Sequence, residues 1–118
     1  MHVMKPTGAR RLILASRNSW HGLVDTFRSE AAFRQEIVLA IVAIALIFAL
    51  DLTAFARAVL VATLGLILIT ELLNTGIEAV VDRVGPEWHA LSKKAKDAGS
   101  AAVTVSLVVH GATWAIVL

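Results

Sequence analysis

The sequence predicts an all-α membrane protein, a single membrane domain over residues 1–118 with an amphipathic N-terminal helix and three membrane-spanning helices. Hydrophobic residues make up 58% of the chain and its mean hydropathy is +0.76, more than a soluble domain of this size needs to fill its core. The charged residues gather at 1–36, 51–57 and 71–97 and leave long apolar stretches between them. Because the chain has no cysteine, disulfides and thiolate metal sites are excluded, and helix packing must hold the fold.

The N-terminal segment, residues 1–29, has the pattern of a helix that lies on the membrane surface. Its apolar residues recur at three- and four-residue spacings: Ile13, Trp20, Leu23, Val24 and Phe27. Its cationic residues can bind lipid headgroups: Arg10, Arg11, Arg17 and Arg28. A plain anchoring helix without chemistry shows the same pattern, so both interpretations stay open.

Three further segments are long enough to cross a bilayer. The first, residues 31–50, would form a helix of about 30 Å. The second, residues 58–84, is apolar as far as Ile69, then carries polar residues until Gly85 and Pro86 end it. The third, residues 98–118, has no charged residue, and small residues at four-residue spacings near its start favour close helix packing.

The distribution of lysine and arginine predicts the orientation of these spans. Six of these residues lie before the first span or in its first turn, one lies between the first and second spans, and four lie at the end of the second span or between it and the third. Cytoplasmic loops carry an excess of positive charge. We therefore expect the N-terminus and the loop at residues 83–97 to face the cytoplasm, with residues 51–57 and the C-terminus on the opposite side.

The second predicted span carries a polar stripe. At 100° per residue, five side chains fall on one side of the helix: Glu71, Asn74, Thr75, Glu78 and Asp82. A charge within the bilayer is costly unless it is paired, hydrated or bound to a metal, so the stripe should face protein, water or a ligand. Hydrogen bonding between helices would explain a lone Asn or Thr. Glu71 and Glu78, together with Glu30 near the first span, instead offer the carboxylate oxygens that Mg²⁺ takes as ligands when it also holds a nucleotide. One of these acids would remain to act as a base.

Other motifs limit the possible chemistry. Lys93, Lys94 and Lys96 follow in the predicted loop and could bind phosphate, although the positive charge expected of a cytoplasmic loop explains them equally well. The sequence has no P-loop, dinucleotide-binding turn or protein-kinase catalytic loop, which excludes those nucleotide-binding folds. A small oligomeric transporter or channel is the alternative from another class, although the acids reach the cytoplasmic end of the second span instead of lying at mid-membrane.

Three motifs resemble the prokaryotic diacylglycerol kinase family, and the likeness extends from about Gly8 to the C-terminus. They are EAAFRQE at Glu30–Glu36, ELLNTGIEAVVDR at Glu71–Arg83 and AKDAGSAAV at Ala95–Val103. The resemblance implies a kinase of the bacterial inner membrane that phosphorylates 1,2-diacylglycerol with ATP and Mg²⁺ to give phosphatidic acid. It also implies a homotrimeric helical bundle with active sites shared between subunits, a periplasmic C-terminus and no nucleic-acid partner. An undecaprenol kinase of the same family is the closer alternative.

The resemblance also implies roles for individual residues. Glu71 matches the general base on the lipid hydroxyl, and Glu30 and Glu78 match the carboxylates that hold Mg²⁺. The other nucleotide contacts fall on Asn18, Glu87, His89, Lys96 and Asp97. Lipid contacts fall on Arg11, Ser19, Trp20, Arg34, Gln35, Ser100 and Trp114, as well as on Glu71. Asn74 and Asp82 are expected to support Glu71 and Glu78. Asn18 departs from the pattern, since an aromatic residue is expected at this position.

Overall fold

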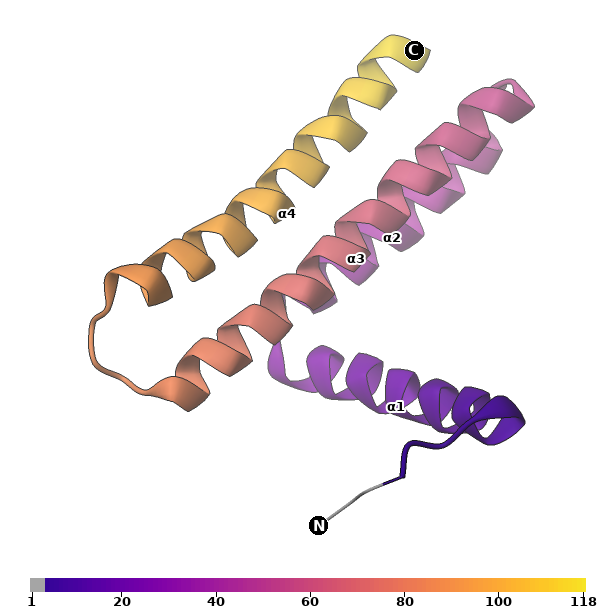
Figure 1. The fold of residues 1–118 in the computed structure, drawn as a ribbon. Helices are drawn as coiled ribbons and strands as arrows, with labels where there is room; N and C mark the ends of the chain where they lie inside the picture. The colour runs from indigo at the N-terminus through magenta and orange to yellow at the C-terminus, as the bar shows by residue number, and fades with distance from the viewer. Residues whose placement is uncertain (1–3) are drawn as a thin grey trace.

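A computed structural model describes residues 4–118 as four α-helices (Figure 1). These are α1 (Gly8–Ser29), α2 (Ala31–Ala49), α3 (Ala54–Val84) and α4 (Ala90–Val117), and the described residues include no strand. Helices α2, α3 and α4 are each long and apolar enough to cross a membrane. The predictions of an all-α chain and of three helices of spanning length are therefore confirmed.

The predicted N-terminal region of residues 1–29 contains α1, and its first three residues lie outside the described part of the chain. Helix α2 matches the predicted first span to within one residue. Helix α3 begins at Ala54, earlier than the predicted start at residue 58, because the Thr53 hydroxyl accepts a hydrogen bond from the Ala56 amide at 3.1 Å. Such a cap satisfies one of the free N–H groups at a helix start.

The predicted loop at residues 83–97 requires a correction. Helix α3 continues to Val84 and α4 begins at Ala90, so only Gly85–His89 connects them. His89 Nδ1 accepts a hydrogen bond from the Leu91 amide at 3.0 Å and caps the new helix. Lys93, Lys94 and Lys96 therefore lie in the first turns of α4 and not in a loop. The helix runs into this segment because helix formation depends on capping and backbone hydrogen bonds, whereas the prediction followed the apolar run alone.

Helix α3 is the central element and contacts each of the other three helices. Figure 1 shows α2, α3 and α4 running alongside one another, while α1 leaves the bundle in a different direction. The core between α2 and α3 is built from small and aliphatic side chains, including Ala40, Ala43, Leu64 and Ile67. Many apolar side chains on the outer faces are exposed, such as Phe55 and Ile116. Apolar surface of this extent requires an apolar environment, either lipid or further protein.

Two arginines fix the corners between successive helices. Arg34 donates from Nη1 to the carbonyl oxygens of Phe27 and Arg28 at 2.8 and 3.0 Å. Arg57 donates from Nε and Nη2 to those of Ile47 and Leu50 at 3.1 and 3.0 Å. The last carbonyl groups of a helix have no partner within the helix. Each arginine thus satisfies the end of the helix that precedes it and links it to the helix that follows.

A line of polar contacts joins α3 to α4. The hydroxyl groups of Thr70 and Ser106 lie 3.0 Å apart, and the Thr63 hydroxyl lies 2.8 Å from His110 Nδ1. Helices surrounded by lipid gain little from the hydrophobic effect on association, so hydrogen bonds and close backbone approach contribute much of their packing. These contacts fix the register of α4 along α3.

Candidate functional site

The polar stripe on α3 becomes less buried from Glu71 toward Asp82. Glu71 is 5% exposed and Asn74 8% exposed, Thr75 and Glu78 are partly buried, and Asp82 is exposed near the end of the helix. The stripe therefore runs from the interior of the bundle to the connection between α3 and α4. A ligand with a charged end and an apolar end could bind along such a gradient.

Carboxyl groups from three segments lie in the neighbourhood of Glu71. Glu78 of α3 and Glu30, at the junction of α1 and α2, both lie close enough to interact electrostatically with it. Glu36 of α2 also lies close enough to Glu71 for the two carboxyl groups to influence each other. A hydrogen bond between two carboxyl groups requires a proton on one of them, because an ionised carboxylate only accepts. The cluster therefore needs protons or a cation to offset its charge.

Glu36 is a residue of this cluster that the sequence analysis did not assign to the site. In the sequence it stands out only as the last residue of the EAAFRQE motif. Its Oε2 atom is buried and has no hydrogen-bond partner among the described residues. An acidic residue at the start of an otherwise apolar span is itself a signal of function, and that signal could have identified it.

The carboxylates fit a magnesium ion that arrives with a nucleotide. Within residues 4–118, no three His, Cys, Asp or Glu side chains converge as a complete metal site. Mg²⁺ is commonly held by only one or two carboxylates, and water and substrate phosphates supply its other ligands. Glu30 and Glu78 each lie near enough to Glu71 to act on it electrostatically, so either can supply a carboxylate of the kind that Mg²⁺ takes.

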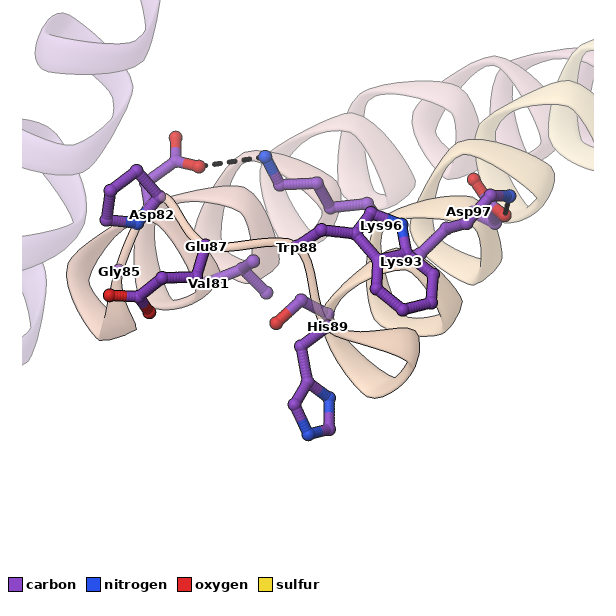
Figure 2. A pocket seen from close by; sticks show the side chains of 11 residues that line it. Val81, Asp82, Gly85, Glu87, Trp88, His89, Lys93, Lys96 and Asp97 are labelled. Atoms are coloured by element: carbon purple, nitrogen blue, oxygen red, sulfur yellow. Dashed lines mark hydrogen bonds and ion pairs between the residues drawn. The ribbon is translucent and has the colours of Figure 1, made fainter.

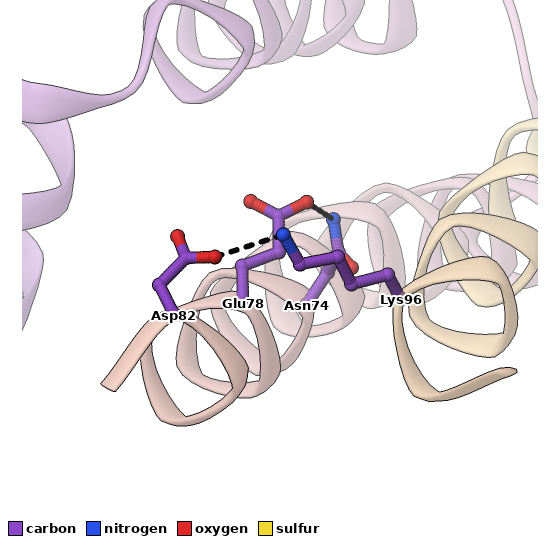
Figure 3. Close-up of polar contacts among 4 residues, drawn as sticks. All are labelled: Asn74, Glu78, Asp82 and Lys96. Carbon is purple, nitrogen blue, oxygen red and sulfur yellow. Dashed lines mark hydrogen bonds and ion pairs between the residues drawn. The ribbon is translucent and has the colours of Figure 1, made fainter. Parts of the chain in front are cut away.

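Asn74 connects the acidic stripe to α4. Its Nδ2 donates to Glu78 Oε1 at 3.3 Å (Figure 3). Its Oδ1 is buried and has no hydrogen-bond partner in the described part of the chain. This oxygen faces Gly99, where an added Cβ would overlap it. The backbone of α4 thus approaches the Asn74 amide closely, and Gly99 leaves the space that this amide occupies.

A second group of the predicted residues lines a cavity of about 380 Å³ at the connection between α3 and α4. The predicted nucleotide contacts among them are Glu87, His89, Lys96 and Asp97 (Figure 2). Lys96 Nζ donates to Asp82 Oδ1 at 2.8 Å, and Lys93 pairs with Asp97. Figure 2 shows the His89 ring directed away from Lys96. Its Nδ1 is used as the cap of α4, which leaves Nε2 for a ligand.

The remaining predicted residues are distributed over three helices. Asn18 lines a separate cavity on α1 together with Arg11, so a predicted nucleotide contact and a predicted lipid contact lie together there. Ser19 and Trp20 are exposed on α1, Gln35 on α2 and Ser100 on α4, whereas Trp114 is partly buried on α4. Arg34 uses its guanidinium group at the corner between α1 and α2. A single chain therefore does not gather the predicted lipid contacts into one pocket.

Comparisons with known proteins give a consistent result. A family model described as prokaryotic diacylglycerol kinase matches residues 17–118. A diacylglycerol kinase of Escherichia coli (strain K12) is 47% identical over 112 residues, which cover 95% of this chain and 92% of the relative. A diacylglycerol kinase of Pseudomonas aeruginosa PAO1 is 50% identical over 112 residues, which cover 95% of this chain and 91% of the relative. One from Haemophilus influenzae Rd is 41% identical over 114 residues, with 97% of each chain covered.

The close approach of α4 to Asn74 leads to a prediction about stability. We expect Gly99→Ala to destabilise the protein by about 1 to 3 kcal/mol, because the new methyl group overlaps Asn74 Oδ1 and must displace a side chain or a helix. The loss is measured as a shift of the thermal or denaturant unfolding transition of the purified protein in detergent micelles.

Gly111→Ala is the matched control, since Gly111 lies on the same helix and its added Cβ would meet nothing within 4 Å. This variant should be neutral or stabilised by roughly 0.5 to 1 kcal/mol, as expected for alanine in a helix. The double variant Asn74→Ala, Gly99→Ala should recover part of the loss. Equal stability of the Gly99 and Gly111 variants would show that the two helices do not approach closely at this point.

Proposed function

The chain belongs to the prokaryotic diacylglycerol kinase family and is a membrane lipid kinase; we propose that it transfers the γ-phosphoryl group of ATP to the hydroxyl of 1,2-diacylglycerol. The product is phosphatidic acid, and the setting is the bacterial inner membrane. The observation that carries the proposal is the buried carboxyl of Glu71 with Glu30 and Glu78 beside it. This arrangement offers a base and a pair of magnesium ligands at the membrane-embedded end of a polar stripe.

Phosphoryl transfer requires a protein mainly to position the reactants and to stabilise the charge on the phosphates. In the proposed reaction, Glu71 accepts the proton of the diacylglycerol hydroxyl as its oxygen bonds to the γ-phosphorus. The bond from this phosphorus to the oxygen it shares with the β-phosphate breaks, and ADP leaves. Burial of Glu71 keeps water from competing with the lipid hydroxyl as the acceptor. Asn74 supports the site by holding Glu78 with its amide.

Charge on the phosphates is offset by a cation and by basic residues. Glu30 and Glu78 would hold Mg²⁺, which supplies charge neutralisation when it is bound. Lys96 lines the neighbouring cavity with Glu87, His89 and Asp97, where a nucleotide can bind. Its partner Asp82 holds it at the edge of this cavity. Because the pair is exposed, it contributes little to stability, and Lys96 can exchange Asp82 for a phosphate oxygen at small cost.

The lipid is proposed to enter from the surface helix. Arg11, Ser19 and Trp20 lie on α1, whose basic and apolar residues suit the headgroup region. Arg34 and Gln35 begin α2, and Arg34 holds the corner that orients α1 relative to the bundle. Ser100 and Trp114 offer contacts along α4. The distribution of lysine and arginine favours one orientation in the membrane. In it, the N-terminus and the connection between α3 and α4 face the cytoplasm, and the C-terminus faces the periplasm.

We further propose a homotrimer with active sites shared between subunits. Asn18 and Arg11 line a cavity on α1, apart from the one that contains Glu87 and Lys96. The outer faces of α2, α3 and α4 expose many apolar side chains. Three spans enclose too little volume for a nucleotide, a metal ion and a lipid, so neighbouring copies would complete the enclosure and shield the acids from acyl chains.

The test of the function is a direct assay of acceptors. Purified protein in mixed micelles is given radiolabelled ATP with either 1,2-diacylglycerol or undecaprenol, and lipid products are separated. Label in phosphatidic acid is the expected result. Label only in undecaprenyl phosphate would reassign the acceptor within the family. Absence of any labelled lipid would refute the kinase function and favour a transporter or channel.

In the same assay, we expect Glu71→Gln to abolish phosphoryl transfer while the protein keeps its fold and oligomeric state. The amide preserves the shape of the side chain but cannot accept the proton. Asp51→Asn is the control, because it makes the same chemical change at an exposed position between α2 and α3. Wild-type turnover by the Glu71 variant would rule out its assignment as the base.

A second prediction concerns the metal. Glu30→Gln and Glu78→Gln should each raise the Mg²⁺ concentration needed for half-maximal activity, since an amide oxygen is a weaker ligand than a carboxylate for a hard cation. Activity is measured over a Mg²⁺ titration at fixed ATP. Unchanged titration curves in both variants would place the metal elsewhere.

Mixing of inactive variants tests the shared site. Arg11→Ala and Glu71→Gln alter α1 and α3, which line different parts of the proposed site. If each site draws these residues from different subunits, some mixed trimers contain one intact site, and activity should return once dissociated subunits are mixed and reassembled. A fluorescence or tag-based measurement must confirm the exchange.

Glu30→Gln mixed with Glu71→Gln serves as the control at a Mg²⁺ concentration where the Glu30 variant is inactive. Glu30 and Glu71 interact within one chain, so every site in this mixture carries a lesion and activity should stay at background. If the Arg11 and Glu71 mixture also stays at background despite proven exchange, both residues serve the same chain's site and the shared-site proposal fails.

A further inference from the structure

His110 is a buried polar residue with no part in the proposed phosphoryl transfer. It lies in α4 with 6% of its surface exposed, and both of its ring nitrogens have partners. Nδ1 lies 2.8 Å from the Thr63 hydroxyl of α3, and Nε2 accepts a hydrogen bond from Trp114 Nε1 at 3.0 Å. The imidazole therefore links the indole of Trp114 to the neighbouring helix.

The hydrogen bonds define which nitrogen carries the proton. An indole N–H only donates, so Nε2 must be the acceptor and Nδ1 must carry the hydrogen. Nδ1 then donates to the Thr63 hydroxyl, whose own proton goes to the Leu60 carbonyl at 3.1 Å. One arrangement thus satisfies every donor and acceptor in the chain from Trp114 to Leu60. No second arrangement does so, because the indole cannot accept.

This network holds the Trp114 side chain in one orientation. The rings of His110 and Trp114 meet edge to face, with centroids 6.2 Å apart and an angle of 83° between their planes. Trp114 is only partly buried. The indole therefore presents a fixed aromatic surface to the apolar surroundings near the end of α4.

The position of Trp114 along the bundle shows what it can contact. The bond between Thr70 and Ser106 places Glu71, the next residue on α3, near the level of Ser106. Ser106, His110 and Trp114 follow one another at four-residue spacing on α4. Trp114 then lies about 12 Å further from the cytoplasmic end than Ser106, at 1.5 Å per residue. When the lipid hydroxyl lies at Glu71, only its acyl chains extend to that depth.

We propose that His110 is a positioning residue that holds Trp114 as an acyl-chain contact, so that the pair makes binding of the lipid acceptor depend on chain length. The proposal rests on the proposed function, because it assigns a recognition element to the same lipid kinase site. His110 itself touches neither the nucleotide nor the reacting atoms. Its effect on the lipid is transmitted through the orientation of the indole.

The test compares dihexanoylglycerol, whose chains are too short to reach Trp114 from Glu71, with dioleoylglycerol, whose chains extend past it. We expect His110→Phe to raise the KM for dioleoylglycerol about fivefold, the effect typical of one lost hydrogen bond. The KM for dihexanoylglycerol, the KM for ATP and kcat should stay unchanged. Trp114→Phe should cause the same selective change, and the double variant should show no further loss.

Two variants separate positioning from a general loosening of the helices. His110→Gln keeps a side-chain acceptor for the Trp114 indole and should restore much of the wild-type ratio of KM values. Ser106→Ala removes a different buried polar group that also contacts α3, without touching Trp114, and it should leave the ratio unchanged. If His110→Phe does not fold, Trp114→Phe must still produce the selective change for the proposal to stand.

Equal changes for the two lipids in His110→Phe or Trp114→Phe, or the same selective change in Ser106→Ala, would overturn the proposal. If the proposed kinase function is wrong, the wild-type protein phosphorylates neither diacylglycerol. That result would overturn both the kinase function and the role of His110. Normal wild-type activity with an unaltered KM ratio in the variants would overturn the role of His110 alone.

Discussion

The burial of carboxyl groups on α3 is the constraint on which the rest of the structure depends. An acid at the depth of a bilayer is costly unless protein, protons or a cation surround it. Glu36 on α2 and Glu30 at the corner after α1 add further negative charge near Glu71, so this group of acids requires protons or a cation to be stable there. The same grouping concentrates negative charge at the site proposed for a magnesium nucleotide. The condition that makes the acids tolerable in the membrane therefore also suits them to the proposed phosphoryl transfer.

The seam between α3 and α4 shows how a small bundle holds its register without a large apolar core. Near the site, Gly99 allows the α4 backbone to approach Asn74. Further along, Thr70 contacts Ser106 and Thr63 contacts His110. Small residues and hydrogen bonds are the main sources of packing energy between helices in lipid. Because the contacts lie along one line, a shift of α4 would disturb the acidic stripe and the indole of Trp114 together.

The helix connections fix the residues around the proposed site. Arg34 and Arg57 close the ends of α1 and α2 by donating to their last carbonyl groups. The short connection after α3 puts Lys96 on a helix opposite Asp82 and not on a mobile loop. A lysine anchored in this way loses less freedom when it binds a phosphate than one on a flexible segment. This rigidity suits a reaction in which positioning is the protein's main contribution.

The sequence by itself determined the four helical segments, the three spans and the polar stripe, because hydropathy and helical periodicity depend on residues close together in the chain. The motifs at Glu30, Glu71 and Ala95 also identified the family before any contact was known. Helices α3 and α4 begin before the spans predicted from residues 58 and 98, because caps at Thr53 and His89 set the helix starts. Only the tertiary structure revealed that Glu36 lies near Glu71 and that Gly99 leaves space for the Asn74 amide. It also revealed that hydrogen bonds of His110 link Trp114 to α3. Most of these contacts join residues far apart in the chain, and local patterns carry no information about which distant side chains meet.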